Sequence, residues 1–269
     1  MIRLPDIALT DAAAEGLRDL QAEVDAAGSY ADQVDEGKRL FELRNRRGNA
    51  IFDEVKRVLT LMCSGARRCA YCEDSAADEV EHIRPKDLYP DVVFAWANYI
   101  YACGPCNGPK GSHFAVSVEG TVDPVEVARK PKAPIVPPLD GAPALIDPRV
   151  EDATKLMSLD LRETYWFTPL AAKGTHDHAR AVYTIKTLRL NIRDELPRAR
   201  REAYRDYVAH VRHYQRERDT RTSASRLTEL REAVQRRQHP TVWREMKRQR
   251  ERLPELRALF ADVPEAADW

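Results

Sequence analysis

The sequence lacks the features that mark membrane and secreted proteins. It has no apolar run near the ~18–20 residues of a membrane span. The first residues lack the basic start, the apolar stretch and the cleavage site of a signal peptide. We therefore expect a cytoplasmic protein. With 43% hydrophobic residues among 269, the chain can form one large or two small domains with a real core.

The chain also has no net charge, because Lys and Arg number 43, and so do Asp and Glu. The distribution is nevertheless uneven, since residues 180–257 contain 22 Lys and Arg but only 11 Asp and Glu. Such asymmetry is typical of a half that faces nucleic acid. It is equally typical of solvated helices with a basic bias, or of a surface that docks an acidic partner, and composition does not separate these alternatives.

Hydrophobic periodicity and proline content predict an α+β protein that is mostly helical. Residues 7–27 and 30–62 read as helices, with an interruption at Gly48, whereas seven prolines make residues 124–148 an extended connector. Residues 156–169 alternate like a β-hairpin, and the chain from Asp177 onward is helical. The expected parts are a helical N-terminal region (1–64), a metal-binding finger (65–123), a Pro-rich connector with a β-hairpin (124–176) and a basic helical C-terminal region (177–269).

Four of the five cysteines form two Cys-x2-Cys pairs, which are Cys69 with Cys72 and Cys103 with Cys106. Two such pairs supply four thiolates, which close the tetrahedral shell of a structural zinc ion and leave no position open for catalysis. Buried or redox-active cysteines are the alternative. Cys63 stands apart and is expected to be a small buried residue.

The residues between and after these pairs carry a second motif. It reads Glu81-His82-Ile83-x-Pro85, then Asn98, then Asn107 directly after the last cysteine and Lys110 three residues further on. Over residues 68–112, the pattern resembles the HNH endonucleases, in the subgroup whose ββα-metal finger is clamped by a zinc ribbon. This resemblance implies a metal-dependent hydrolase that cuts DNA phosphodiester bonds with Mg²⁺ or Mn²⁺.

The resemblance also implies a role for each motif residue. His82 is the general base that deprotonates water, and Glu81 and Asn107 hold the catalytic divalent metal. Asn98 orders the loop that carries the histidine. Lys110 lies one helical turn past Asn107, and from this position we expect it to contact a phosphate oxygen. We expect His82 to be a partly exposed side chain on which the fold does not depend. Two positions depart from the commonest family pattern, because many members have Asp at the place of Glu81 and His at the place of Asn107.

Two downstream segments, residues 145–152 and 183–191, show a looser resemblance to HNH nucleases of antiphage defence systems, namely the Septu nuclease subunit and retron-associated proteins. It implies a role in antiviral defence with an ATPase-type sensor subunit as partner. The rival interpretation is a zinc-ribbon module that grips nucleic acid or protein without cutting, and an RNA-cutting enzyme also remains open.

Other histidines are better explained by structure than by chemistry. His113 lies off the family pattern, six residues after Asn107. His176 and His178 flank Asp177, which suggests a helix start with a capping aspartate rather than a second metal site.

Overall fold

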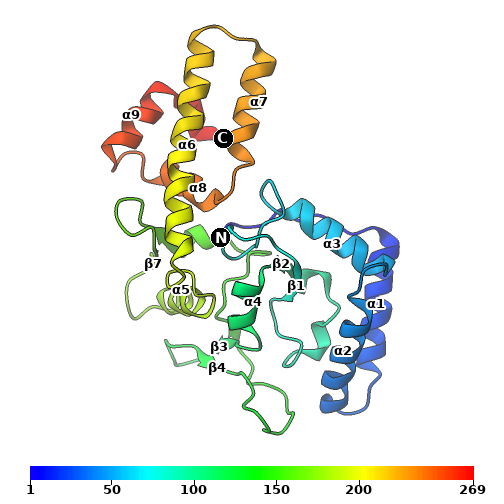
Figure 1. Ribbon diagram of the computed structural model, residues 1–269. Helices are drawn as coiled ribbons and strands as arrows, with labels where there is room; N and C mark the ends of the chain where they lie inside the picture. Colours follow the sequence, from blue (N-terminus) through cyan, green and yellow to red (C-terminus); the bar gives the residue numbers. More distant parts are fainter.

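The computed structural model describes residues 1–269, and its N-terminal part is a unit of three helices at one end of the molecule (Figure 1). These helices are α1 (Asp11–Asp25), α2 (Tyr30–Arg44) and α3 (Ala50–Met62). The predicted interruption at Gly48 is confirmed, because Gly48 has a φ of +87° in the turn before α3, a conformation that glycine adopts at little cost. Side chains of Ser29 and Asn49 cap α2 and α3.

The finger consists of an antiparallel β-hairpin followed by a short helix. Its elements are β1 (Glu79–His82), β2 (Tyr99–Ala102) and α4 (Gly104–Lys110), with two 3₁₀ turns between the strands, η1 (Pro90–Val92) and η2 (Trp96–Asn98). The register pairs Glu81 with Ile100 and His82 with Tyr99. This ββα order matches the predicted finger and puts His82 at the very end of its strand.

The connector is extended as predicted, but it also contributes strands. Strand β3 (Ala115–Ser117) lies between β4 (Val125–Glu126) and β5 (Ala142–Pro143) in a small antiparallel sheet. The predicted hairpin at residues 156–169 is confirmed as β6 (Met157–Leu159) and β7 (Phe167–Pro169), preceded by the 3₁₀ turn η3 (Ala153–Lys155).

The C-terminal region is helical from α5 onward, and α6 with α7 forms a hairpin that projects from the molecule (Figure 1). Its elements are α5 (His176–Thr187), α6 (Glu195–Asp219), α7 (Ala224–Gln235), α8 (Pro240–Arg248), α9 (Pro254–Asp262) and the 3₁₀ turn η4 (Pro264–Asp268). Pro240 and Pro254 begin α8 and α9, where a missing N–H is tolerated. None of the helices combines the length and apolar character that a membrane span requires.

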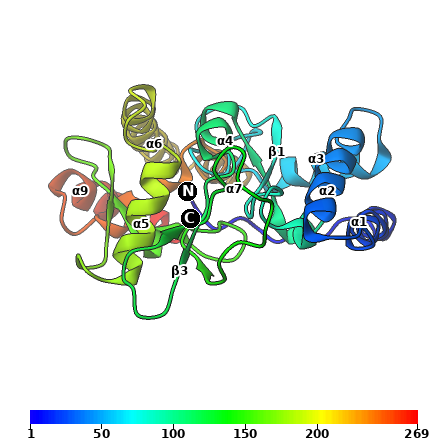
Figure 2. The same ribbon diagram turned by 90° about the horizontal axis from the view of Figure 1, so that it is seen from below.

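The β1–β2 hairpin lies between two hydrophobic cores, because side chains of a strand alternate between its two faces. Val80, Tyr99 and Tyr101 face the core of the N-terminal helices. Ile100 and Ala102 face the larger core, which contains the four cysteines and the C-terminal helices. The finger therefore sits at the centre of the molecule, with α1–α3 at one end and α5 and α9 at the other (Figures 1 and 2).

Candidate functional site

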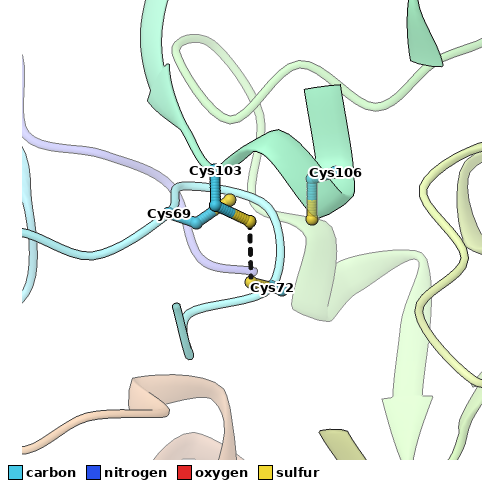
Figure 3. A group of neighbouring side chains, drawn as sticks. All are labelled: Cys69, Cys72, Cys103 and Cys106. Carbon is cyan, nitrogen blue, oxygen red and sulfur yellow. Dashed lines mark hydrogen bonds between the residues drawn. The ribbon is translucent and has the colours of Figure 1, made fainter. Parts of the chain in front are cut away.

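The four predicted cysteine ligands converge on one point, as Figure 3 shows. Their sulfur atoms all lie within 4.8 Å of one another, and all four cysteines are buried and free of disulfides. The Sγ atoms of Cys72 and Cys103 are 3.8 Å apart. Zn–S bonds of ~2.3 Å in a tetrahedron require sulfur atoms about 3.8 Å apart, so the cluster fits a zinc ion.

Part of the motif borders a polar cleft of about 580 Å³, which is also lined by Gly104, the residue after Cys103. Glu81, His82 and Asn107 all line it. Neighbours on a strand normally point to opposite faces, but His82 is the last residue of β1, and both side chains reach the same cleft. The N-terminal helices contribute Phe41 of α2 and Lys56 of α3 to the lining of the same cleft.

His82 is held more tightly than expected. Its exposed fraction is 4%, its ring packs against Phe41 and Tyr99, and its Nε2 lies 3.0 Å from the carbonyl oxygen of Val93. A carbonyl only accepts hydrogen bonds, so Nε2 carries the proton and Nδ1 is the free acceptor. The expectation of a partly exposed His82 is therefore wrong, because α2 covers the ring.

The same burial sets the charge of the imidazole. Burial, followed by the positive charge of Lys86, lowers the pKa of His82 from its ordinary value to about 3. The ring is therefore neutral at pH 7 and can accept a proton. It is a weaker base than a hydrated imidazole, because the buried position disfavours the imidazolium.

Asn98 binds the backbone of the loop that follows β1. Its Oδ1 accepts from the Arg84 N–H at 2.8 Å, and its Nδ2 donates to the carbonyl oxygens of Arg84 and Val92. These three bonds hold the two ends of the loop between the strands together. The arrangement agrees with an ordering role for Asn98 rather than with direct chemistry.

Lys110 lies elsewhere than the sequence suggests. Its side chain is completely buried, its ammonium group forms a close ion pair with Glu81, and it donates to the His82 carbonyl oxygen at 2.8 Å. Proline-containing α4 turns this residue inward rather than toward solvent. Lys110 does not line the cleft, so contact with a phosphate there would require its ion pair with Glu81 to break.

Asn107 reaches the cleft from α4, and its Nδ2 donates to Glu79 Oε2 at 2.6 Å. This bond leaves the amide oxygen of Asn107 available. Glu79 lines the same cleft and lies two residues before Glu81, hence on the same strand face. Sequence reasoning missed Glu79, although the period-2 spacing contained the signal. Glu79, Glu81 and Asn107 thus bring oxygen atoms to one cleft, and carboxylate and amide oxygens are ligands of the type that Mg²⁺ takes.

The cleft also contains features with no local sequence signal. Phe41 and Lys56 are brought to it only by the packing of α2 and α3. A second cavity, of about 820 Å³, is lined by Arg84 and Asn98 from the segment between β1 and β2. Glu81, His82 and Asn107 do not border this second cavity.

The other histidines of the sequence analysis and Cys63, to which no catalytic role was given, do not line the cleft. His113 is 62% exposed and faces Glu126, with 3.5 Å between Nδ1 and Oε1. His176 begins α5, as expected, but Thr175 rather than Asp177 caps the helix by accepting from the His178 N–H. Cys63 is half-buried at the end of α3.

Fold and site together define an α+β chain in which four cysteines, placed to bind a metal ion, lie near a polar cleft. Over 85 residues, the chain is 35% identical to the Septu protein PtuB of Bacillus thuringiensis. The matched part covers 30% of this chain and 33% of PtuB, so the chain spans about a third of that relative. No family model and no solved structure matches the chain.

Proposed function

We propose that the protein is a metal-dependent endonuclease of the HNH type that hydrolyses DNA phosphodiester bonds. The observation that carries the proposal is the meeting of His82, Glu81 and Asn107 at one polar cleft beside the four-cysteine cluster. A passive zinc ribbon has no use for a neutral imidazole next to several oxygen donors. The similarity to PtuB supports the same interpretation.

In this proposal, His82 Nδ1 accepts a proton from the attacking water, and the Nε2 bond to Val93 holds the ring in the required tautomer. Glu81 and Asn107, with Glu79 beside them, would hold a divalent cation through oxygen. Such a cation stabilises the negative charge that develops on phosphorus oxygens and on the leaving 3′ oxygen. The buried ammonium group of Lys110 balances part of the negative charge of the Glu81 carboxylate.

Lys56 and Lys86 replace Lys110 as the expected phosphate contacts. Both side chains are half-buried and line the cleft, and the Lys86 ammonium lies 5.4 Å from the centre of the Phe41 ring. Because both line the cleft, we propose that their positive charges attract the scissile phosphate.

Replacing Lys86 by methionine is expected to weaken DNA binding about equally for all sequences and to reduce the slope of log K against log salt concentration by about 1. Lys56→Met should act in the same direction. Lys173→Met, at an exposed position outside the cleft, is the matched control. Equal salt slopes for Lys86→Met and the control, measured by fluorescence anisotropy, would contradict this assignment.

The basic helix α6 is expected to add affinity rather than chemistry. Of its arginines, Arg200 is unsuited to a surface role because it is 1% exposed and donates to the carbonyl oxygens of Tyr165 and Leu190. Arg198 and Arg205 are exposed. Charge reversal of both to glutamate should weaken DNA binding with a shallower salt slope, or weaken capture of a partner protein. If neither changes, these charges belong to a solvated face.

We further propose that this activity serves bacterial defence against phage, as the nuclease effector beside an ATPase-type sensor subunit. Support comes from the likeness to PtuB, which is named a Septu protein, and from the two downstream segments described above. The test is plaque formation on cells that carry the gene with its neighbouring genes, compared with cells that carry a His82→Gln variant. Equal plaque counts would contradict the defence role.

The activity itself is tested with purified protein on plasmid, single-stranded DNA and RNA, in Mg²⁺, Mn²⁺ or EDTA. We expect metal-dependent cleavage of DNA that EDTA abolishes and that His82→Gln lacks. Binding without cleavage under all conditions would favour the non-catalytic zinc-ribbon module. Cleavage restricted to RNA would assign the same site to an RNA-cutting enzyme.

A further inference from the structure

The turn between α5 and α6 places an arginine directly on the four-cysteine cluster. Arg193 Nη1 donates to Cys106 Sγ at 3.6 Å, and the side chain is 11% exposed. Its Nε and Nη2 are buried without a hydrogen-bond partner. The guanidinium carries a positive charge, because arginine is not deprotonated in proteins.

The charge of the cluster explains why a cation belongs there. Four thiolates around one divalent cation carry a net charge of −2, and the four sulfurs are buried. A buried charge is unfavourable unless it is paired. Arg193 supplies one positive charge at contact distance, whereas the neighbouring cation Arg200 is engaged with backbone carbonyls. The nearest carboxylate to Arg193, Glu195, lies 3.3 Å from Nε and is 60% exposed, where solvent screens it.

Two further contacts join the same cluster to the C-terminal helices. Glu73, directly after Cys72, accepts from Thr241 N at 3.1 Å and from Thr241 Oγ1 at 2.7 Å. The next residue, Asp74, pairs with His239 Nε2 at 3.2 Å. His239 and Thr241 flank Pro240, the first residue of α8. The first cysteine knuckle therefore contacts α8, while the second contacts the turn before α6.

We propose that Arg193 is a positioning residue for the four-cysteine metal centre, and that it couples metal binding to the docking of the C-terminal helices. Because coupling is reciprocal, helices that dock more firmly when metal is bound must raise metal affinity by the same factor. This inference goes beyond the proposed nuclease activity and does not depend on it. It concerns the metal centre that clamps the finger, not the cleft.

The test measures metal affinity by competition between the full-length protein and a chromophoric zinc chelator. Arg193→Gln, which removes the charge and keeps a polar side chain, is expected to bind zinc ~10–100-fold more weakly, the range typical of groups that contact metal ligands. Arg193→Lys should restore most of the affinity. The matched control is Arg198→Gln, which removes an exposed arginine near the same helix start and should leave affinity unchanged.

A second readout is hydrogen exchange of residues 177–269 with zinc bound and after chelation. In the wild type, chelation should increase exchange around Arg193 and at the start of α8, and Arg193→Gln should already show increased exchange with zinc bound. Wild-type zinc affinity in Arg193→Gln would overturn the proposal. Equal loss in Arg193→Lys and Arg193→Gln would also overturn it, because it would assign Arg193 to packing rather than to charge.

Discussion

Replacing His82 by glutamine is expected to lower DNA cleavage by ~10²–10⁴-fold, the usual loss when a general base is removed. Glutamine is chosen because alanine would leave a cavity beside Phe41 and Tyr99. Large-to-small replacements in a core destabilise a protein by about 2–5 kcal/mol, which would confuse loss of chemistry with loss of fold. The amide of glutamine can still donate to the Val93 carbonyl oxygen. Cleavage rate, DNA affinity and melting temperature are measured together.

Tyr99→Phe is the matched control for this experiment. The Tyr99 hydroxyl donates to the same Val93 carbonyl oxygen at 2.6 Å, so the control disturbs the surroundings of His82 without removing the imidazole. It should lower stability by about 1 kcal/mol and retain most of the cleavage. A His82→Gln protein that cuts at the wild-type rate in a contaminant-free preparation would refute the nuclease assignment.

The Asn107→Ala variant distinguishes the role of a metal ligand from the role of the general base. It removes a proposed oxygen ligand, so cleavage should fall and raised Mn²⁺ should partly restore it. Raised Mn²⁺ should not restore His82→Gln, because that variant lacks a proton acceptor rather than a ligand. Identical responses of the two variants to Mn²⁺ would contradict the division of roles between them.

Replacing Cys103 by serine is expected to produce the largest loss of stability in the molecule. A structural zinc ion contributes its binding free energy to folding, with apparent values of about 10–16 kcal/mol in zinc-finger peptides. Cys103 directly precedes α4, which carries Cys106 and Asn107, so the loss should also disorder the cleft. The expected results are loss of stoichiometric zinc by elemental analysis and a lower melting temperature.

The matched control is Cys63→Ser, which removes the fifth cysteine outside the cluster. It should retain one zinc ion per chain. Folded wild-type protein that contains no metal by elemental analysis would contradict the interpretation as a metal centre. The four cysteines would then be interpreted as buried or redox-active residues.

Much of the fold was predictable because it depends on local patterns. Gly48 interrupts the N-terminal helices because its backbone adopts a positive φ, and Pro240 and Pro254 start helices because they need no N–H partner there. The connector at residues 124–148 was expected to be extended, and its two short strands were not foreseen. Their pairing partner β3 lies outside that segment, so local sequence does not reveal them.

The sequence by itself determined which chemical groups this protein has. The spacing of the four cysteines predicted one metal site, and the motif identified His82 and Asn107, which the structure places at the end of a strand and on the following helix. These features follow from residues that are close together along the chain, where turn and strand geometry is set locally.

Tertiary structure alone decided how these groups are surrounded. The ring of His82 is buried because Phe41, from a helix about 40 residues earlier, packs against it. Lys110 faces Glu81 because α4 packs against β1. Arg193 meets Cys106 from 87 positions away. Burial and charge pairing depend on which distant segments share a core, and periodicity along one segment contains no information about that choice.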